Sequence, residues 1–169
     1  MERISLLMKN RMKKIFLIIF TIILIIIIGI VVSINVFKEN KITLDMQKLA
    51  LDLINQSIFE DDLSEIDRDS IVKKYNFPND KIKNIISYMG SGATAEEILL
   101  LEVFNREDTG EILNIIKEKL EERKQDFQNY LPKEVFKLEN YYLKSVNNYI
   151  ILCISNDEKQ AEKIINKYI

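Results

Sequence analysis

The sequence predicts an α+β protein with a single N-terminal transmembrane helix. Residues 15–37 form an uncharged apolar run, and two pairs of short β-branched segments follow, each pair joined by turn residues and alternating with amphipathic helical patterns. We expect a two-layer sandwich in which helices cover one face of a four-stranded antiparallel sheet, with a ββαββα core. The expected regions are a short basic cytoplasmic segment (1–14), the transmembrane helix (15–37), a linker (38–43) and an extracytoplasmic domain (44–169).

The apolar run is long enough to cross a bilayer. At about 1.5 Å per residue, a helix over 15–37 is roughly 35 Å long, against a hydrocarbon core of about 30 Å. No small-residue cleavage site ends the run, and the only cysteine, Cys153, is too distant for a lipoprotein anchor. We therefore predict an uncleaved anchor that contacts the lipid bilayer through Ile15–Phe37.

The charges beside this run predict its orientation. Five basic residues precede it, and the lysines that follow it are accompanied by Glu39. Because positive charge is retained in the cytoplasm, we place the N-terminus there and the C-terminal domain outside the cell membrane. Gly29 and Ser33, four residues apart, fit a helix-dimer face, although two small residues at that spacing also occur by chance.

Composition narrows the classes of function. From Lys38 onward acidic residues outnumber basic ones by six, which argues against a nucleic-acid partner. The chain has no histidine and no tryptophan, so the usual general base and the commonest metal ligand are absent. A single cysteine forms no intramolecular disulfide, and Cys153 lies in the apolar run YIILCIS, which favours a buried structural thiol over a nucleophile.

The first amphipathic segment is residues 43–59. Its apolar positions Met46, Leu49, Ala50 and Leu53 share one helical face, and Thr43 is available as an N-cap. We expect this helix to pack on the domain, the alternative being a stalk or a helix that binds a partner.

The acidic segment 60–69 suggests a calcium loop by composition but not by spacing. An EF-hand loop needs a central glycine, and this stretch has none. We expect a solvated acidic loop that caps a short helix over 70–75, which Pro78 ends.

The stretch MGSGATAEE, 89–97, separates two segments with strand character, 81–89 and 97–104. A glycine turn in a hairpin fits this order. The alternative is a phosphate cradle, for which the candidates are Ser91, Gly92 and Thr94. A cradle of this kind opens a helix, and Thr94 with Glu97 has capping-box spacing, but the P-loop Lys-Ser/Thr is missing.

The rest of the chain predicts a helix, a second hairpin and a last helix. The helix over 105–131 carries Ile112, Ile116, Leu120 and Phe127 on one face and stops at Leu131-Pro132. Strands at 134–146 and 149–155 flank Asn147-Asn148, which tolerates a tight turn. The last helix, 157–169, buries Ala161, Ile164, Ile165 and Tyr168.

Several of these segments together resemble a family of Firmicute cell-envelope proteins known as a domain of unknown function. The resemblance runs from about Leu44 to the C-terminus. It rests on VKKYNF, on the small-residue turn followed by AEEI, on DFQNYLP, and on NNYIILCISND leading into the last helix. It implies membrane tethering or a lipoprotein-like form, no established activity, and no catalytic residue to carry over.

We therefore predict a non-catalytic binding or interaction module of the cell envelope, with no cofactor, no metal, no catalytic residue and an envelope or membrane protein as its partner. One alternative is a structural or sensory subunit of a membrane complex, with Gly29, Ser33 and the 43–59 helix as contacts. A less favoured one is a small hydrolase that uses two carboxylates. The candidate carboxylates are Glu96, Glu97, Glu102 and Asp61.

Overall fold

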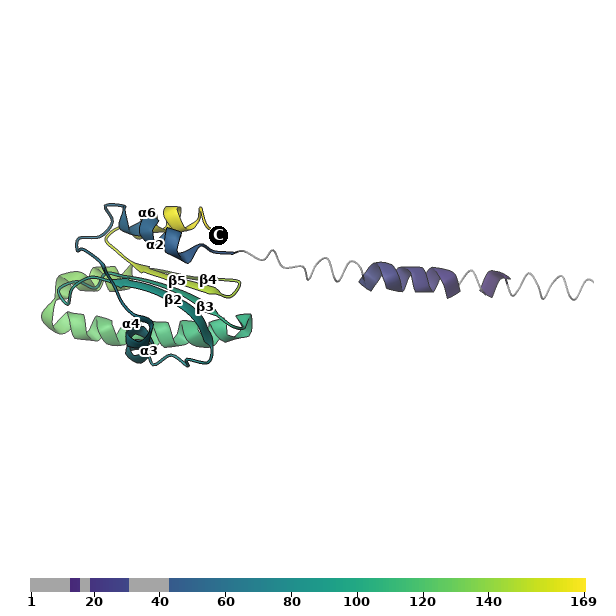
Figure 1. Ribbon diagram of the computed structural model, residues 1–169, viewed down its shortest axis with the longest axis horizontal. Coiled ribbons are helices and arrows are strands. Elements are labelled where there is room, and N and C mark those ends of the chain that lie inside the picture. Colours follow the sequence, from purple (N-terminus) through teal and green to yellow (C-terminus); the bar gives the residue numbers. More distant parts are fainter. Residues whose placement is uncertain (1–12, 16–18, 31–42) are drawn as a thin grey trace, which may run out of the picture. The chain divides into compact units, whose positions relative to one another are not determined.

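A computed structural model describes residues 13–15, 19–30 and 43–169 (Figure 1). The chain forms two compact units, Met1–Lys41 and Ile42–Ile169.

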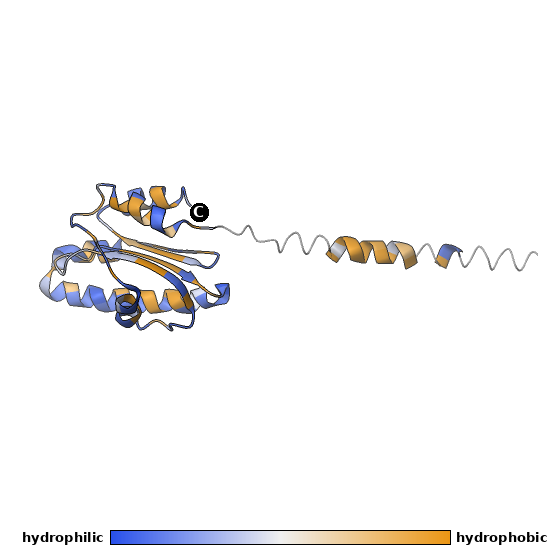
Figure 2. Ribbon diagram, in the orientation of Figure 1, coloured by the Kyte–Doolittle hydropathy of each residue, from blue (hydrophilic) through white to orange (hydrophobic). Residues whose placement is uncertain are grey.

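The first unit contains one helix, Lys13–Ile30, that is long and apolar enough to cross a membrane by length and composition. Its described side chains are exposed, and most of them are hydrophobic (Figure 2). A signal sequence meets the same criteria, so a permanent anchor stays a prediction. Much of the predicted span lies outside the described residues, as does Ser33, and the Gly29/Ser33 dimer face is therefore also still a prediction.

The second unit is a five-stranded antiparallel sheet between helices. The strand order is β1-β2-β3-β5-β4. The strands are β1 (Ser64–Glu65), β2 (Ile82–Met89), β3 (Glu97–Val103), β4 (Tyr142–Val146) and β5 (Tyr149–Ile154). Helices α2 (Met46–Ile54) and α6 (Glu158–Ile165) cover one face, and α3 (Arg68–Tyr75) and α4 (Thr109–Tyr130) cover the other (Figure 1). The two-layer, four-stranded expectation is thus corrected to three layers and five strands.

The middle strand β3 explains the third layer. Ile98 and Leu100 belong to the core cluster formed with α2 and α6, whereas Leu99 and Leu101 belong to the cluster formed with α3 and α4. All four side chains are fully buried. A strand without polar alternation is typical of burial on both faces, because both pleat directions then meet apolar partners. The run EILLLEV carries this signal, and the two-layer expectation overlooked it.

The fifth strand, β1, is two residues within the segment expected to be an acidic loop. Ser64 pairs with Met89, and Glu65 pairs with Tyr88. Both β1 side chains are exposed, so no hydrophobic pattern marks this edge strand in the sequence.

Both predicted hairpins are confirmed. Strands β2 and β3 pair antiparallel and close at Met89 and Glu97, and β4 and β5 close at Val146 and Tyr149. Asn147 has φ 54°, a left-handed conformation that asparagine tolerates better than most residues.

Three local details differ from expectation. Asp45, rather than Thr43, caps α2, because its carboxylate accepts the Lys48 N–H. Asn76, in a left-handed conformation, ends α3 before Pro78. The segment expected to open a strand at Glu134 instead forms helix α5 (Val135–Glu139), and the strand begins only at Tyr142.

The predicted buried faces of the helices are confirmed. The four apolar positions of α2 are buried against the sheet, which supports packing on the domain rather than a free stalk. In α4 and α6 the predicted positions are buried as well: Ile112, Ile116, Leu120, Phe127, Ala161, Ile164 and Ile165. Tyr168 is partly buried against the same cluster.

Candidate functional site

The β2–β3 loop carries the three anion candidates and leads into a strand rather than a helix. Its backbone N–H groups mostly bond within the domain. Ser91 N–H donates to Asp61 Oδ2 at 2.7 Å, Ala93 N–H to Ser91 Oγ at 3.3 Å, and Thr94 N–H to Ser91 O at 3.2 Å. Hydrogen bonds from Ser91 hold the pKa of Asp61 below its ordinary value. The loop is therefore fixed in shape, and most of its amides are already engaged.

Gly90 allows this tight loop. A Cβ there would collide with Thr94 Oγ1 and would lie 3.2 Å from Asp61 Oδ2. A Cβ on Gly92 would meet open space. The requirement for glycine at position 90 is thus steric and comes mainly from Thr94 of the same loop, with Asp61 as a second close neighbour.

A pocket of about 310 Å³ lies beside the loop. Its walls come from three parts of the chain that are distant in sequence: α3, the β2–β3 loop and the C-terminal half of α4. The lining residues are Lys74, Met89, Gly90, Ser91, Gly92, Thr94, Arg123, Asp126, Phe127 and Tyr130. The predicted candidates Ser91, Gly92 and Thr94 therefore do lie together on a cavity wall, opposite cations that the sequence reasoning did not identify.

The two cations of the pocket share one buried carboxylate, which we call the Glu97 cluster: Lys74, Tyr75, Glu97 and Arg123. Glu97 is fully buried, and its Oε2 accepts Lys74 Nζ at 2.9 Å and Arg123 Nη1 at 2.5 Å. The other oxygen, Oε1, accepts the Tyr75 hydroxyl at 2.8 Å. One negative charge thus faces two positive ones.

Burial and the neighbouring charges shift the pKa values of Lys74 and Tyr75. Burial, followed by the charge of Arg123, lowers the pKa of Lys74 to about 8, although Glu97 opposes the shift. Burial and the neighbouring Glu97 charge raise the pKa of Tyr75 well above its ordinary value. Tyr75 therefore stays protonated and donates to the carboxylate.

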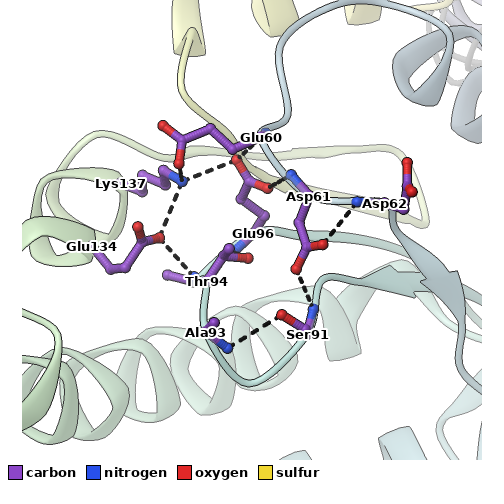
Figure 3. Close-up of polar contacts among 10 residues, drawn as sticks. Glu60, Asp61, Asp62, Ser91, Ala93, Thr94, Glu96, Glu134 and Lys137 are labelled. Atoms are coloured by element: carbon purple, nitrogen blue, oxygen red, sulfur yellow. Dashed lines mark hydrogen bonds and ion pairs between the residues drawn. The ribbon is translucent and has the colours of Figure 1, made fainter.

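A second cluster surrounds the preceding residue, and we call it the Glu96 cluster: Glu60, Glu96, Glu134 and Lys137 (Figure 3). Lys137 Nζ lies 3.0 Å from Glu96 Oε1, 3.1 Å from Glu134 Oε2 and 3.4 Å from Glu60 Oε2. Hydrogen bonds to Glu96 and Glu134 outweigh the opposing effect of burial and raise the pKa of Lys137. The ammonium group is therefore held in its charged form.

Backbone donors balance the extra carboxylates of the Glu96 cluster. Glu96 accepts the N–H groups of Glu60 at 2.8 Å and Asp61 at 2.9 Å, and Glu134 accepts the Ala95 N–H at 3.0 Å (Figure 3). Such bonds stabilise a buried carboxylate by replacing the water it has lost. The cluster ties the chain after α2, the start of β3 and α5 together.

The carboxylates considered for hydrolysis are each engaged by partners within the described domain. Glu96 and Glu97 have separate sets of partners, and Glu102 accepts Lys83 Nζ at 2.7 Å and Asn148 Nδ2 at 3.2 Å. Asp61 holds the β2–β3 loop. Each of the four carboxylates thus has a structural role in the described domain.

The described residues provide neither a group of metal ligands nor an accessible thiol. Within residues 13–15, 19–30 and 43–169, no three His, Cys, Asp or Glu side chains are grouped so that they could hold a metal ion. Cys153 is buried in β5, and burial raises the pKa of its thiol to about 12. The predicted structural thiol is confirmed as buried.

A family model described as a domain of unknown function, DUF4358, matches residues 56–155. This is more than half of the chain. The chain belongs to the DUF4358 family. The DUF4358 match includes both clusters and all five strands of the sheet, and it begins later and ends earlier than the resemblance read from the sequence. No curated protein and no solved structure matches the chain.

Proposed function

We propose that this DUF4358 protein is a single-pass, membrane-anchored and extracytoplasmic binding module of the cell envelope, without catalytic activity of its own. The observation that carries the proposal is the full engagement of its buried carboxylates next to an open pocket. Glu96 and Glu97 each accept three hydrogen bonds from groups of the domain itself. A catalytic carboxylate needs access to substrate, whereas Glu97 joins α3 and α4 to β3, and Glu96 joins the segment after α2 and α5 to the start of β3.

Rigid walls support binding because a preformed site loses little conformational entropy when it is occupied. The pocket joins elements that the two clusters already fix to β3. The Lys13–Ile30 helix supplies the proposed anchor, and its exposed apolar side chains need a lipid or protein cover.

Capture of bound material from native membranes tests the binding function. The full-length tagged protein is crosslinked in its own membranes, purified and compared with the part from Lys38 onward. Material retained by both forms supports a tethered binding domain. Material retained by the full-length form alone points instead to a subunit of a membrane complex that contacts other chains through its N-terminal helix. If neither form retains any component, the binding proposal fails.

Cysteine labelling tests the orientation. Cys153 is buried and its thiol has a raised pKa, so a maleimide does not label it in the folded protein. We expect Glu121→Cys, on the exposed face of α4, to react in intact cells with a maleimide that cannot cross membranes. The unsubstituted chain is the matched control. Labelling of Glu121→Cys only after the cells are lysed would place the domain in the cytoplasm and contradict the proposal.

A further inference from the structure

The Glu97 cluster contains one more cation than its carboxylate can balance. Both positive side chains are largely removed from solvent, with 22 % of the Lys74 side chain and 12 % of the Arg123 side chain exposed. A desolvated charge is costly unless an opposite charge or well-formed hydrogen bonds compensate it. The Glu96 cluster has such compensation from backbone N–H groups, whereas in the Glu97 cluster two cations share one carboxylate.

The remaining contacts of Lys74 are weak. Besides Glu97, its Nζ lies 5.1 Å from the centroid of the Tyr75 ring and 3.2 Å from Met89 Sδ, and neither a ring face nor a thioether sulfur replaces an anionic acceptor. Arg123 uses Nη2 for the Ala95 carbonyl at 3.1 Å and Nη1 for Glu97, so further guanidinium N–H donors are left. Both cations line the pocket and still have hydrogen-bonding capacity.

The charges on the pocket wall favour an anion. Asp126 is the one acidic residue that lines it, against Lys74 and Arg123. Thr94 Oγ1 accepts the Glu96 N–H at 3.3 Å, which leaves its O–H free to donate. Within the described part of the chain, Gly92 N–H donates to no protein group. The wall thus offers both cationic and neutral donors.

Aromatic side chains also line the pocket. The rings of Phe127 and Tyr130 lie 5.1 Å apart between centroids, and Tyr130 is 57 % exposed. The two rings are tilted by 31° to each other, and Phe127 is buried, so the exposed Tyr130 ring offers most of the aromatic surface against which a ring or an aliphatic body can pack. The pocket therefore combines cationic donors with apolar ring surface.

We infer that this pocket binds an organic monoanion whose singly charged oxyanion, a phosphodiester or a carboxylate, bonds to Lys74 and Arg123 while its apolar body packs on Phe127 and Tyr130. This inference rests on the proposed binding function and names its ligand class. A monoanion matches a cluster in which two cations share one carboxylate, while Asp126 on the same wall carries an opposing charge. The anion is held by two side chains from α3 and α4, rather than by a row of backbone amides as in a phosphate loop.

Calorimetric titration of the full chain in detergent micelles tests the inference. The probes are acetate, benzoate and dimethyl phosphate, with glycerol as the uncharged control. We expect saturable binding of the anions and none of glycerol, and benzoate to bind more tightly than acetate because its ring reaches the aromatic wall. The ratio of the affinities for acetate and dimethyl phosphate identifies which oxyanion the site prefers. Absence of saturable binding for all three anions would overturn the inference.

Matched charge variants locate the binding. Lys74→Gln removes one cation and leaves the Arg123–Glu97 and Tyr75–Glu97 contacts, so the fold is retained; unchanged near-ultraviolet circular dichroism checks this. We expect it to weaken anion binding about tenfold, which corresponds to roughly 1.4 kcal/mol. Lys124→Gln removes a positive charge from α4 outside the pocket wall. We expect it to change the anion affinity by less than about twofold, because salt screens a charge that does not contact the anion.

Asp126→Asn should change the anion affinity in the opposite direction. Removal of the one acidic lining group should tighten the binding of the anions about threefold, since a nearby like charge disfavours an anion. Equal affinities for the wild type, Lys74→Gln and Asp126→Asn would show that the probes bind elsewhere and would overturn the assignment of the pocket. If the three affinities are equal and membrane capture still succeeds with Lys74→Gln, the binding function stands and only the pocket assignment fails.

Discussion

Glu96 and Glu97 are adjacent glutamates and both are buried, yet the charged groups around them differ: further carboxylates surround Glu96, and two cations surround Glu97. In the Glu96 cluster three carboxylates share one lysine, and backbone N–H groups supply the rest of the stabilisation. In the Glu97 cluster one carboxylate is shared by a lysine and an arginine. The first cluster is internally compensated, and the second has an excess of positive charge beside a pocket.

The difference follows from alternation along an extended chain. Neighbouring side chains point to opposite sides, so Glu96 faces the segment after α2 and α5, while Glu97 faces α3 and α4. A pair of identical residues in the sequence can therefore have one structural member and one that shapes a binding surface. The surroundings, rather than the residue type, decide the role.

Breaking the Glu96 cluster should have the largest effect. Lys137→Met leaves Glu96 and Glu134 buried without their shared cation, and we expect a loss of about 3–5 kcal/mol in the free energy of unfolding. Urea denaturation of the full chain in micelles, followed by circular dichroism, measures it. Lys133→Met, at an exposed neighbouring position, is the control and should change little. A loss below about 1 kcal/mol for Lys137→Met would show that the backbone donors suffice without the lysine.

Breaking the Glu97 cluster should cost less. Glu97→Gln keeps the side-chain shape but leaves Lys74 and Arg123 without a counter-charge, and water partly reaches both. We expect a loss of roughly 2 kcal/mol, since solvent takes over part of the lost interaction. The same denaturation assay applies. A loss larger than that of Lys137→Met would reverse the comparison between the clusters.

Substitution of the glycines in the β2–β3 loop should have a smaller effect on stability, and one glycine serves as the control for the other. Gly90→Ala places a methyl group against Thr94 and should cost about 1–2 kcal/mol through displacement of the loop. Gly92→Ala, two residues away, points into open space and should change stability by less than about 0.5 kcal/mol. Thermal unfolding of the two variants side by side tests this steric account, and equal melting temperatures would contradict it.

The smallest effect concerns pH. The pKa of Lys74 is lowered from 10.5 to about 8, and the groups that act on it include Glu97, Arg123 and Lys119. Between these two values the unfolded chain binds more protons than the folded one, so the contribution of Lys74 to stability rises with pH. We expect a gain of roughly 1 kcal/mol from pH 8 to 9 relative to Lys74→Met, which lacks the titrating group. Parallel pH profiles of the two proteins would show that Lys74 does not titrate there.

Local features of the fold could be predicted because their causes are local. Asn147-Asn148 turns the second hairpin through its own backbone preferences, and the apolar face of α4 repeats with the helical period. The three-layer arrangement depends on burial of both faces of β3, for which the unbroken run EILLLEV is the signal. The two-residue strand β1 has no such signal, because its side chains are exposed.

The candidate site was predictable only in part. Ser91, Gly92 and Thr94 could be found because glycine and hydroxyl residues gather in few places in this sequence. Lys74 and Arg123 could not be assigned to the same site, since α3 and α4 meet only through packing on the sheet. The pair Glu96-Glu97 before an apolar strand was a usable hint, because two charges that enter a core require partners.

The most direct test of the account is the pKa of Lys74 itself, measured by NMR in the full chain labelled with ¹³C at lysine Cε and assigned with Lys74→Arg. The account predicts a pKa of about 8, because burial and Arg123 outweigh Glu97. It also predicts that saturation with dimethyl phosphate or benzoate raises this pKa, since an anion in the pocket favours the ammonium form. A pKa at or above the ordinary 10.5 in the ligand-free protein would show that the positive charge is already balanced, and would contradict an anion-binding pocket.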